Sequence, residues 1–124
     1  MDDDVHIVVD ASPGGAGQAR RFIAGTLAAW NLGGLARRAI MVGHELVANA
    51  LRHAGPPAGL RLLRRRDSVL LEVTDPELRV PKLPKIDNTT SESGRGLRIV
   101  SMLARRWGVQ LHDDGKTVWA EISE

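Results

Sequence analysis

The sequence contains no cysteine, and its aromatic residues are limited to Phe22, Trp30, Trp107 and Trp119. Without cysteine, the chain can form neither a disulfide framework nor a thiolate metal site. Few side chains are available to stack on nucleic-acid bases. No apolar run approaches the roughly 20 residues that span a membrane, and the acidic start MDDDVHIVV lacks the basic residues of a secretion signal. We therefore expect a cytoplasmic protein with no membrane partner.

What is present is an ordinary globular composition. The chain has 124 residues, of which 43% are hydrophobic and 26% charged, and its formal net charge is only +2. One core is expected at this length, so residues 1–124 are predicted to form a single domain. The densest basic cluster, RLLRRR at 61–66, is either a solvated strand end and turn or part of a nucleic-acid surface. No groove-reading helix motif accompanies it, which favours a protein with no nucleic-acid partner.

Hydrophobic periodicity and turn residues predict the secondary structure. The first helix is expected to have Ser12 as its N-terminal cap, with Pro13 just inside, and a glycine of NLGG as its C-terminal cap. Residues 76–93 contain three prolines and show no sustained hydrophobic periodicity. The segment is longer than an ordinary connection in a compact domain, which favours a functional lid. The predicted elements are a strand at 5–9, helices at 18–30 and 35–53, a hairpin of 59–66 and 68–75, a helix from Gly94, and a closing hairpin of 108–112 and 117–123.

The apolar faces of these elements also predict how the elements pack. Three helices on one face of a mixed, mostly antiparallel sheet satisfy the burial needs of all the apolar faces. The predicted fold class is therefore an α+β two-layer sandwich.

A polar stripe follows the flank of the second predicted helix. Glu45, Asn49 and His53 are spaced four residues apart, beside the apolar face rather than on it. A zinc protease would need a second histidine at Ala48, so hydrolytic zinc chemistry is set aside. A carboxylate and an amide oxygen one turn apart suit Mg²⁺, although the same pair is also common on solvated helices.

Three further motifs have both a functional and an ordinary structural explanation. Asp75 ends an apolar strand just before Pro76, where it could accept a hydrogen bond from an adenine amine or simply form a turn. The glycines of SGRGLRIV, on either side of Arg95, could bind phosphate at a helix start or form a plain loop. Thr117 would direct its hydroxyl either into a pocket or to water.

Taken together and in this order, the motifs resemble those of the GHKL superfamily of ATPases and kinases, which share the Bergerat fold. HELVANALRHA (44–54) is similar to its N-box helix, VTDPE lies where its first glycine box begins, and GRGL matches the second box. The chain is most similar to the small anti-sigma factor serine/threonine kinases and related actinobacterial regulators. Their ending, GRGL followed by LA..WG and GK.VWAE, is matched from Gly94 to Glu121.

The resemblance covers essentially the whole chain and implies a single ATP-binding domain whose lid lies at about 76–93. It implies a regulatory kinase that phosphorylates a small anti-anti-sigma (STAS-type) protein and sequesters a sigma factor, with ATP and Mg²⁺ as cofactors. The implied roles are catalysis by Glu45, Mg²⁺ binding by Asn49, adenine recognition by Asp75, triphosphate binding by Gly94, Arg95, Gly96 and Leu97 of the second box, and assistance near the adenine by Thr117.

The first glycine box departs from the superfamily pattern. Most members read Asp-x-Gly-x-Gly, whereas this chain has Glu77 and Arg79 at the glycine positions. A non-catalytic interaction module of the same fold, with weak or no nucleotide binding, is therefore the alternative. Whether the chain forms a homodimer, through a sheet edge or the first helix, stays open.

Overall fold

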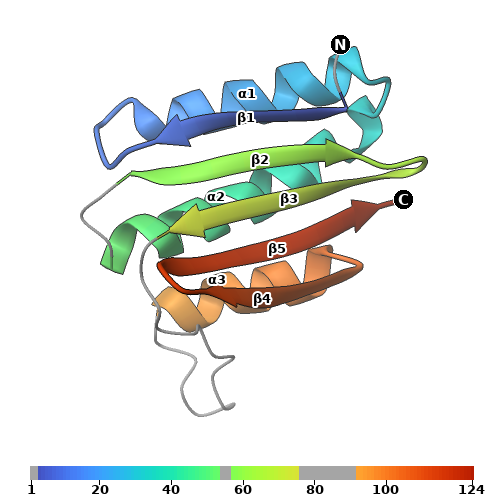
Figure 1. Cartoon of the computed structure of the whole chain (residues 1–124). Coiled ribbons are helices and arrows are strands. Elements are labelled where there is room, and N and C mark those ends of the chain that lie inside the picture. Colours follow the sequence, from blue (N-terminus) through green and yellow to red (C-terminus); the bar gives the residue numbers. More distant parts are fainter. Residues whose placement is uncertain (1–2, 54–56, 76–91) are drawn as a thin grey trace.

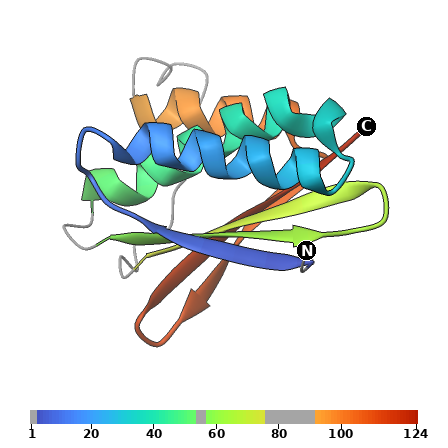
Figure 2. The same ribbon diagram turned by 90° about the horizontal axis from the view of Figure 1, so that it is seen from above.

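The computed structural model describes residues 3–53, 57–75 and 92–124, with side chains for all of these except His53 and 92–96. Within them, three α-helices cover one face of a five-stranded sheet and make two layers (Figure 1; Figure 2). This is the α+β sandwich that the sequence predicts. The elements are β1 (Asp4–Val9), α1 (Gly15–Ala29), the 3-10 turn η1 (Gly33–Leu35), α2 (Ala36–His53), β2 (Ala58–Arg64), β3 (Ser68–Asp75), α3 (Glu92–Leu103), β4 (Arg106–His112) and β5 (Gly115–Ser123).

The sheet has the strand order β1-β2-β3-β5-β4. Each described pairing is antiparallel, so the sheet is more regular than the mixed one expected from the sequence. The two predicted hairpins, β2–β3 and β4–β5, are both present, and β5 lies between β3 and β4. In the part of the chain that is described, no helix combines the length and apolar character needed to cross a membrane.

The C-terminal end of α1 differs from the prediction that a glycine would cap it. Asn31 takes the left-handed conformation, with φ of 59°. The Leu32 N–H donates to the Leu27 carbonyl at 2.8 Å, and the Asn31 N–H donates to the Ala28 carbonyl at 3.2 Å. These two bonds form a Schellman motif, for which asparagine is the usual substitute for glycine.

The start of α1 also differs from the prediction. The N-cap is Gly14, which makes no side-chain capping bond, and Pro13 lies outside the helix. Ser12 instead donates its backbone N–H to Asp10 Oδ1 at 2.9 Å, and its carbonyl accepts from the Gly15 N–H at 3.0 Å. Asp10 therefore forms an Asx-turn ahead of the helix, because its side chain accepts a hydrogen bond from the backbone N–H two residues later.

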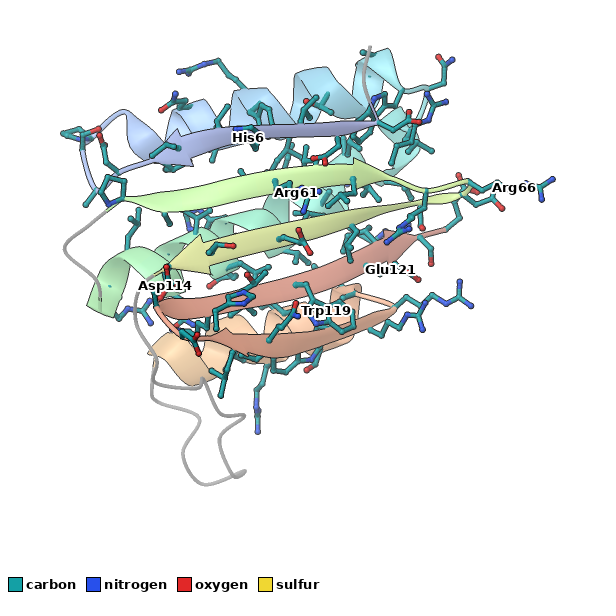
Figure 3. The ribbon with its side chains drawn as sticks, viewed as in Figure 1. His6, Arg61, Arg66, Asp114, Trp119 and Glu121 are labelled. Carbon is teal, nitrogen blue, oxygen red and sulfur yellow. The ribbon has the colours of Figure 1, made fainter. Side chains whose placement is uncertain are left out.

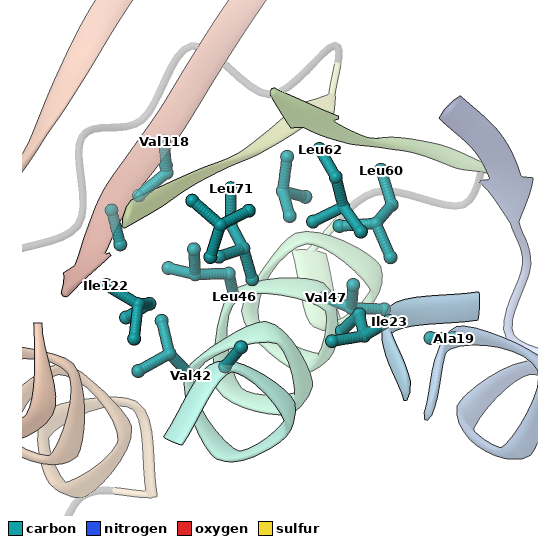
Figure 4. Packing of buried hydrophobic residues seen from close by; sticks show 14 of the residues in the cluster. Ala19, Ile23, Val42, Leu46, Val47, Leu60, Leu62, Leu71, Val118 and Ile122 are labelled. Carbon is teal, nitrogen blue, oxygen red and sulfur yellow. The ribbon is translucent and has the colours of Figure 1, made fainter. Parts of the chain in front are cut away.

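The core lies between the sheet and the helices, with α2 at its centre. Figure 4 shows Val42 and Leu46 of α2 directed toward Leu71 of β3 and Ile122 of β5. All four side chains are at most 2% exposed. Their burial explains why α2 was predictable, since an apolar face repeated over 18 residues fixes both the helix and its orientation.

Gly43 allows α2 to pass close to its neighbours. A β-carbon at this buried position would lie 2.6 Å from Ile23 Cδ1 of α1 and 3.3 Å from Leu71 Cδ2 of β3. Ile23 is itself only 1% exposed, so it has little room to move away. The glycine therefore sets the spacing between α1, α2 and the sheet.

We predict opposite effects for the same substitution at two helical glycines. Gly25→Ala in α1 should stabilise the fold by about 0.5–1 kcal/mol, because its β-carbon would meet nothing within 4 Å. Gly43→Ala gains the same helix propensity but overpacks the core, which costs about 1–3 kcal/mol. In urea unfolding, the free energy of unfolding of Gly43→Ala should therefore be lower than that of Gly25→Ala by roughly the cost of overpacking. Equal stabilisation by both variants would show that Gly43 does not set the helix spacing.

Candidate functional site

A buried ion pair closes one end of the helix-covered sheet face. Asp75, the last residue of β3, lies directly opposite Lys116 of β5, and Lys116 Nζ donates to Asp75 Oδ1 at 3.1 Å. The side chains of Asp75 and Lys116 are 1% and 4% exposed. Val73 and Val118 form the next pair on the same face, so the ion pair continues a row that is otherwise apolar.

Lys116 is the site residue that the sequence analysis missed. A signal for it was present, because Lys116 alternates with the inward residues of β5, Val118, Ala120 and Ile122. A lysine in phase with a buried row needs a partner, since an isolated buried charge is strongly disfavoured. Only the strand register identifies that partner as Asp75.

Thr117 lies on the opposite face of the sheet from Asp75. Its hydroxyl is within 2.8 Å of the Thr74 hydroxyl and within 2.8 Å of His112 Nε2. Neighbouring residues of a strand point to opposite faces, so Thr117 and Thr74 share the uncovered face while Lys116 and Asp75 face the helices. A role beside the adenine would require the side chains of Thr117 and Asp75 to lie together. The structure places them on opposite faces of the sheet.

The helical candidates approach the same end of the sheet as Asp75. In Figure 1, α2 finishes, β3 finishes, and α3 and β5 begin at this end. Glu45 and Asn49 are half-buried on the C-terminal half of α2, and Leu97 of α3 is 3% exposed. The backbone topology thus gathers the helix that carries Glu45 and Asn49, the Asp75 end of β3 and the start of α3 at one edge of the fold.

Some predicted features lie outside what the structure describes. The side chains of His53 and of the second-box residues Gly94, Arg95 and Gly96 are not described, although their backbone belongs to α2 and α3. Residues 76–91, which include most of the predicted lid, are also not described. The third helix begins at Glu92, so the second glycine box lies within its first turns and not ahead of it.

A groove of about 850 Å³ lies between α1 and α2. Its lining combines apolar side chains, such as Ile23 and Leu51, with charged ones that include Arg20 and Glu45. Neither Asn49 nor Asp75 belongs to this lining. Of the predicted site residues whose side chains are described, Glu45 alone lines this groove.

The uncovered sheet face holds exposed charge pairs. Figure 3 looks onto this face and shows Arg61 on β2 and Glu121 on β5, with β3 between them. Arg61 bonds both Asp4 and Glu72, and its hydrogen bond to Asp4 holds the pKa of that carboxyl below its usual value. Such solvent-exposed pairs contribute little to stability. We assign them no role in the site.

Among the described residues, no three histidine, aspartate or glutamate side chains gather where they could hold a metal ion. In the described part of the chain, Asn49 is the candidate ligand for a Mg²⁺ ion at this end. Such a site is chemically reasonable, because Mg²⁺ keeps several waters and commonly takes its other oxygen ligands from substrate phosphates.

Comparison with known proteins agrees with this arrangement. The sequence model of the histidine kinase-like ATPase domain matches residues 9–122. An uncharacterized protein of Streptomyces coelicolor is 38% identical over 81 residues, which cover 62% of this chain and 77% of that protein. The structure of the Acinetobacter baumannii histidine kinase AdeS is similar with a TM-score of 0.54 at 14% identity, covering 96% of this chain and 67% of that chain.

The structural likeness to AdeS shows the fold alone, because the two sequences share so few residues. The family match is stronger, since it spans nearly the whole chain from the end of β1 to the end of β5. It also includes residues 44–54 and 94–97, which resemble the N-box and the second glycine box. The chain belongs to the histidine kinase-like ATPase domain family of the GHKL superfamily, and this membership implies a nucleotide-binding domain.

Proposed function

We propose that this protein is a Mg-ATP-binding regulatory serine/threonine kinase that phosphorylates a small anti-anti-sigma partner and sequesters a sigma factor. The observation that supports it best is the convergence of α2, the Asp75 end of β3 and the start of α3 at one edge of the sheet. This is the arrangement that a nucleotide site between the helices and the sheet requires. The matching family supports the nucleotide, whereas the protein partners rest on the resemblance to anti-sigma factor kinases.

The residues present fit the two ends of a nucleotide. Asp75 supplies a buried carboxylate that can accept a hydrogen bond from the adenine amine. Asn49 offers an amide oxygen for Mg²⁺ on the half-buried flank of α2, and the backbone of the second glycine box forms the first turns of α3. Exposed amides at a helix start favour the negative charge of phosphates.

Glu45 is the proposed catalytic residue. It lies one helical turn before Asn49, so both side chains emerge from neighbouring turns of α2. A carboxylate in this place would accept the proton of the attacking serine or threonine hydroxyl, or orient that hydroxyl. When bound, Mg-ATP supplies the phosphoryl group, and the protein contributes positioning and charge stabilisation.

We expect calorimetric titration to show micromolar binding of Mg-ATP. Asn49→Ala should weaken this binding by at least about tenfold, the lower end of the loss seen when a group that only supports a metal ligand is removed. The difference should vanish in excess EDTA, because Asn49 acts through the metal. Gln18→Ala, which removes an exposed amide from α1, should bind Mg-ATP like the parent protein. Failure of the parent protein to bind millimolar Mg-ATP would overturn the proposal.

A second function is supported by the groove between α1 and α2 and by the altered first glycine box. In this alternative the protein is a non-catalytic module that binds a regulatory protein without phosphorylating it. The groove is lined mainly by apolar side chains with charged ones beside them, as a protein-binding surface requires. Incubation with labelled ATP and the anti-anti-sigma partner separates the two functions, because only the kinase yields phosphoserine or phosphothreonine.

A further inference from the structure

Arginines from three distant parts of the chain meet at one end of the fold. The sequence has four runs of adjacent arginines, at 20–21, 37–38, 64–66 and 105–106. The first run lies within α1, whereas the other three lie at the start of α2, at the β2–β3 turn and at the start of β4. In Figure 1, these three points are at the end of the sheet opposite the one where β3 finishes. We call their seven arginines the arginine end.

Two of the three runs are held by backbone hydrogen bonds near the end of β5. The Arg65 N–H donates to the Ser68 carbonyl at 2.9 Å and closes the β2–β3 turn, and Ser68 pairs with Ser123 of β5. The Arg105 N–H donates to the Glu121 carbonyl at 2.8 Å. The β2–β3 turn and the start of β4 therefore have a common neighbour in the end of β5.

The start of α2 lies beside the same end of β5. A β-carbon on Gly34, three residues before Arg37, would lie 3.9 Å from Oε1 of Glu124. Arg37 is exposed and Arg38 is half-buried. The three runs are thus brought together by the tertiary fold, and the sequence showed only the densest of them.

The arginine end is only partly neutralised by acidic side chains. Asp3 and Glu121 pair with three of its members at N···O distances of 3.3 to 3.8 Å, namely Arg64, Arg105 and Arg106. Among the side chains that the structure describes, no ion pair or hydrogen bond engages its other exposed members, Arg37, Arg65 and Arg66. Part of the basic sequence motif at 61–66 therefore stays available for a partner.

We infer that the arginine end is a docking surface for the acidic face of a partner protein. The planar guanidinium group can bond a carboxylate through two parallel N–H donors, which makes arginine well suited to ion pairs at interfaces. The arginines project from a closed turn and from the ends of regular elements, so their backbone is ordered before the partner arrives. The surface lies away from the nucleotide edge, and the inference does not depend on the proposed nucleotide site.

An acidic protein fits this surface better than a nucleic acid. Asp67 shares the β2–β3 turn with two of the arginines, and Glu124 follows β5, so exposed carboxylates are interspersed among the cations. These carboxylates would repel a phosphate backbone, whereas a protein partner can meet them with basic side chains. Trp107, beside this surface, is half-buried and donates its indole N–H to Ser101 at 2.9 Å, so it is not presented for stacking on a base.

Fluorescence anisotropy with a labelled poly-glutamate peptide tests the inference at about 0.1 M salt, where charges more than about 10 Å apart are largely screened. Arg66→Glu and Arg37→Glu reverse one exposed charge on two different runs. Each should weaken peptide binding about threefold to tenfold, because the reversal removes an exposed ion pair and adds a repulsion. Arg21→Glu makes the same change in net charge at an exposed position of α1, and its Kd should stay within about twofold of the parent value.

Circular dichroism establishes that the three variants are folded. If Arg21→Glu weakens binding as much as Arg66→Glu, the peptide responds to net charge alone and the surface is overturned. An effect at Arg66 without one at Arg37, or no peptide binding by the parent protein, would also contradict a surface shared by the runs. A labelled DNA duplex is titrated under the same conditions, and tighter binding of the duplex than of the peptide would overturn the acidic protein as the partner.

Discussion

Lys116→Met is expected to lower the free energy of unfolding by about 3–5 kcal/mol, the cost of leaving a buried charge without its counter-charge. The variant keeps an unbranched side chain but removes the ammonium that donates to Asp75 at 3.1 Å. Both members of the pair are at most 4% exposed, so water compensates little for the lost contact. Urea unfolding of the parent and variant proteins measures the difference.

Two further variants test the cause of this loss. Asp75→Leu combined with Lys116→Met should recover most of the stability, because neither charge is then buried. Arg64→Met removes a cation from an exposed pair with Asp3 and should leave the unfolding midpoint almost unchanged. If the double variant is as unstable as Lys116→Met alone, lost packing rather than charge is the cause.

Glu45→Gln is expected to slow phosphorylation of the anti-anti-sigma partner by about 10²–10⁴-fold, the usual contribution of a positioned general base. The amide keeps the size of the carboxylate but cannot accept a proton, so Mg-ATP binding should change little. Single-turnover assays with labelled ATP measure the rate, and calorimetry measures the binding.

Glu124→Gln provides the matched control for this prediction. It makes the same chemical change at an exposed residue beyond β5, so its phosphorylation rate should equal that of the parent protein. A Glu45→Gln variant that phosphorylates at the parent rate would show that Glu45 is not the base. An inactive parent protein that still binds the partner would favour the interaction module.

The fold was predictable because long apolar patterns determine it. The helix predicted at 35–53 is found at Ala36–His53, and the two hairpins follow from β-prone runs that flank short turns. The predicted cap residues of α1 were wrong, because the positions of the caps depend on individual backbone hydrogen bonds that the apolar pattern does not specify. Asn31 and Gly14 occupy the positions that the sequence assigned to a glycine of NLGG and to Ser12.

The site was less predictable, because it depends on contacts between distant parts of the chain. Sequence spacing placed Glu45 and Asn49 correctly on one flank of α2, since both belong to one helix. The pairing of Asp75 with Lys116 depends on the register of β3 against β5, which no local pattern specifies. The same register places Thr117 on the other face, where His112 and Thr74 bond its hydroxyl.

The position of β5 also affects how the protein folds during translation. β3 gains its second neighbouring strand only after residues 115–123 have been synthesised, because β5 lies between β3 and β4 and follows β4 in the chain. Until then, the growing polypeptide presents an unpaired edge of apolar residues that favours aggregation. Ribosome-bound chains that stop short of β5 should therefore depend on chaperones, and the contact between Asp75 and Lys116 can form only after β5 has been made.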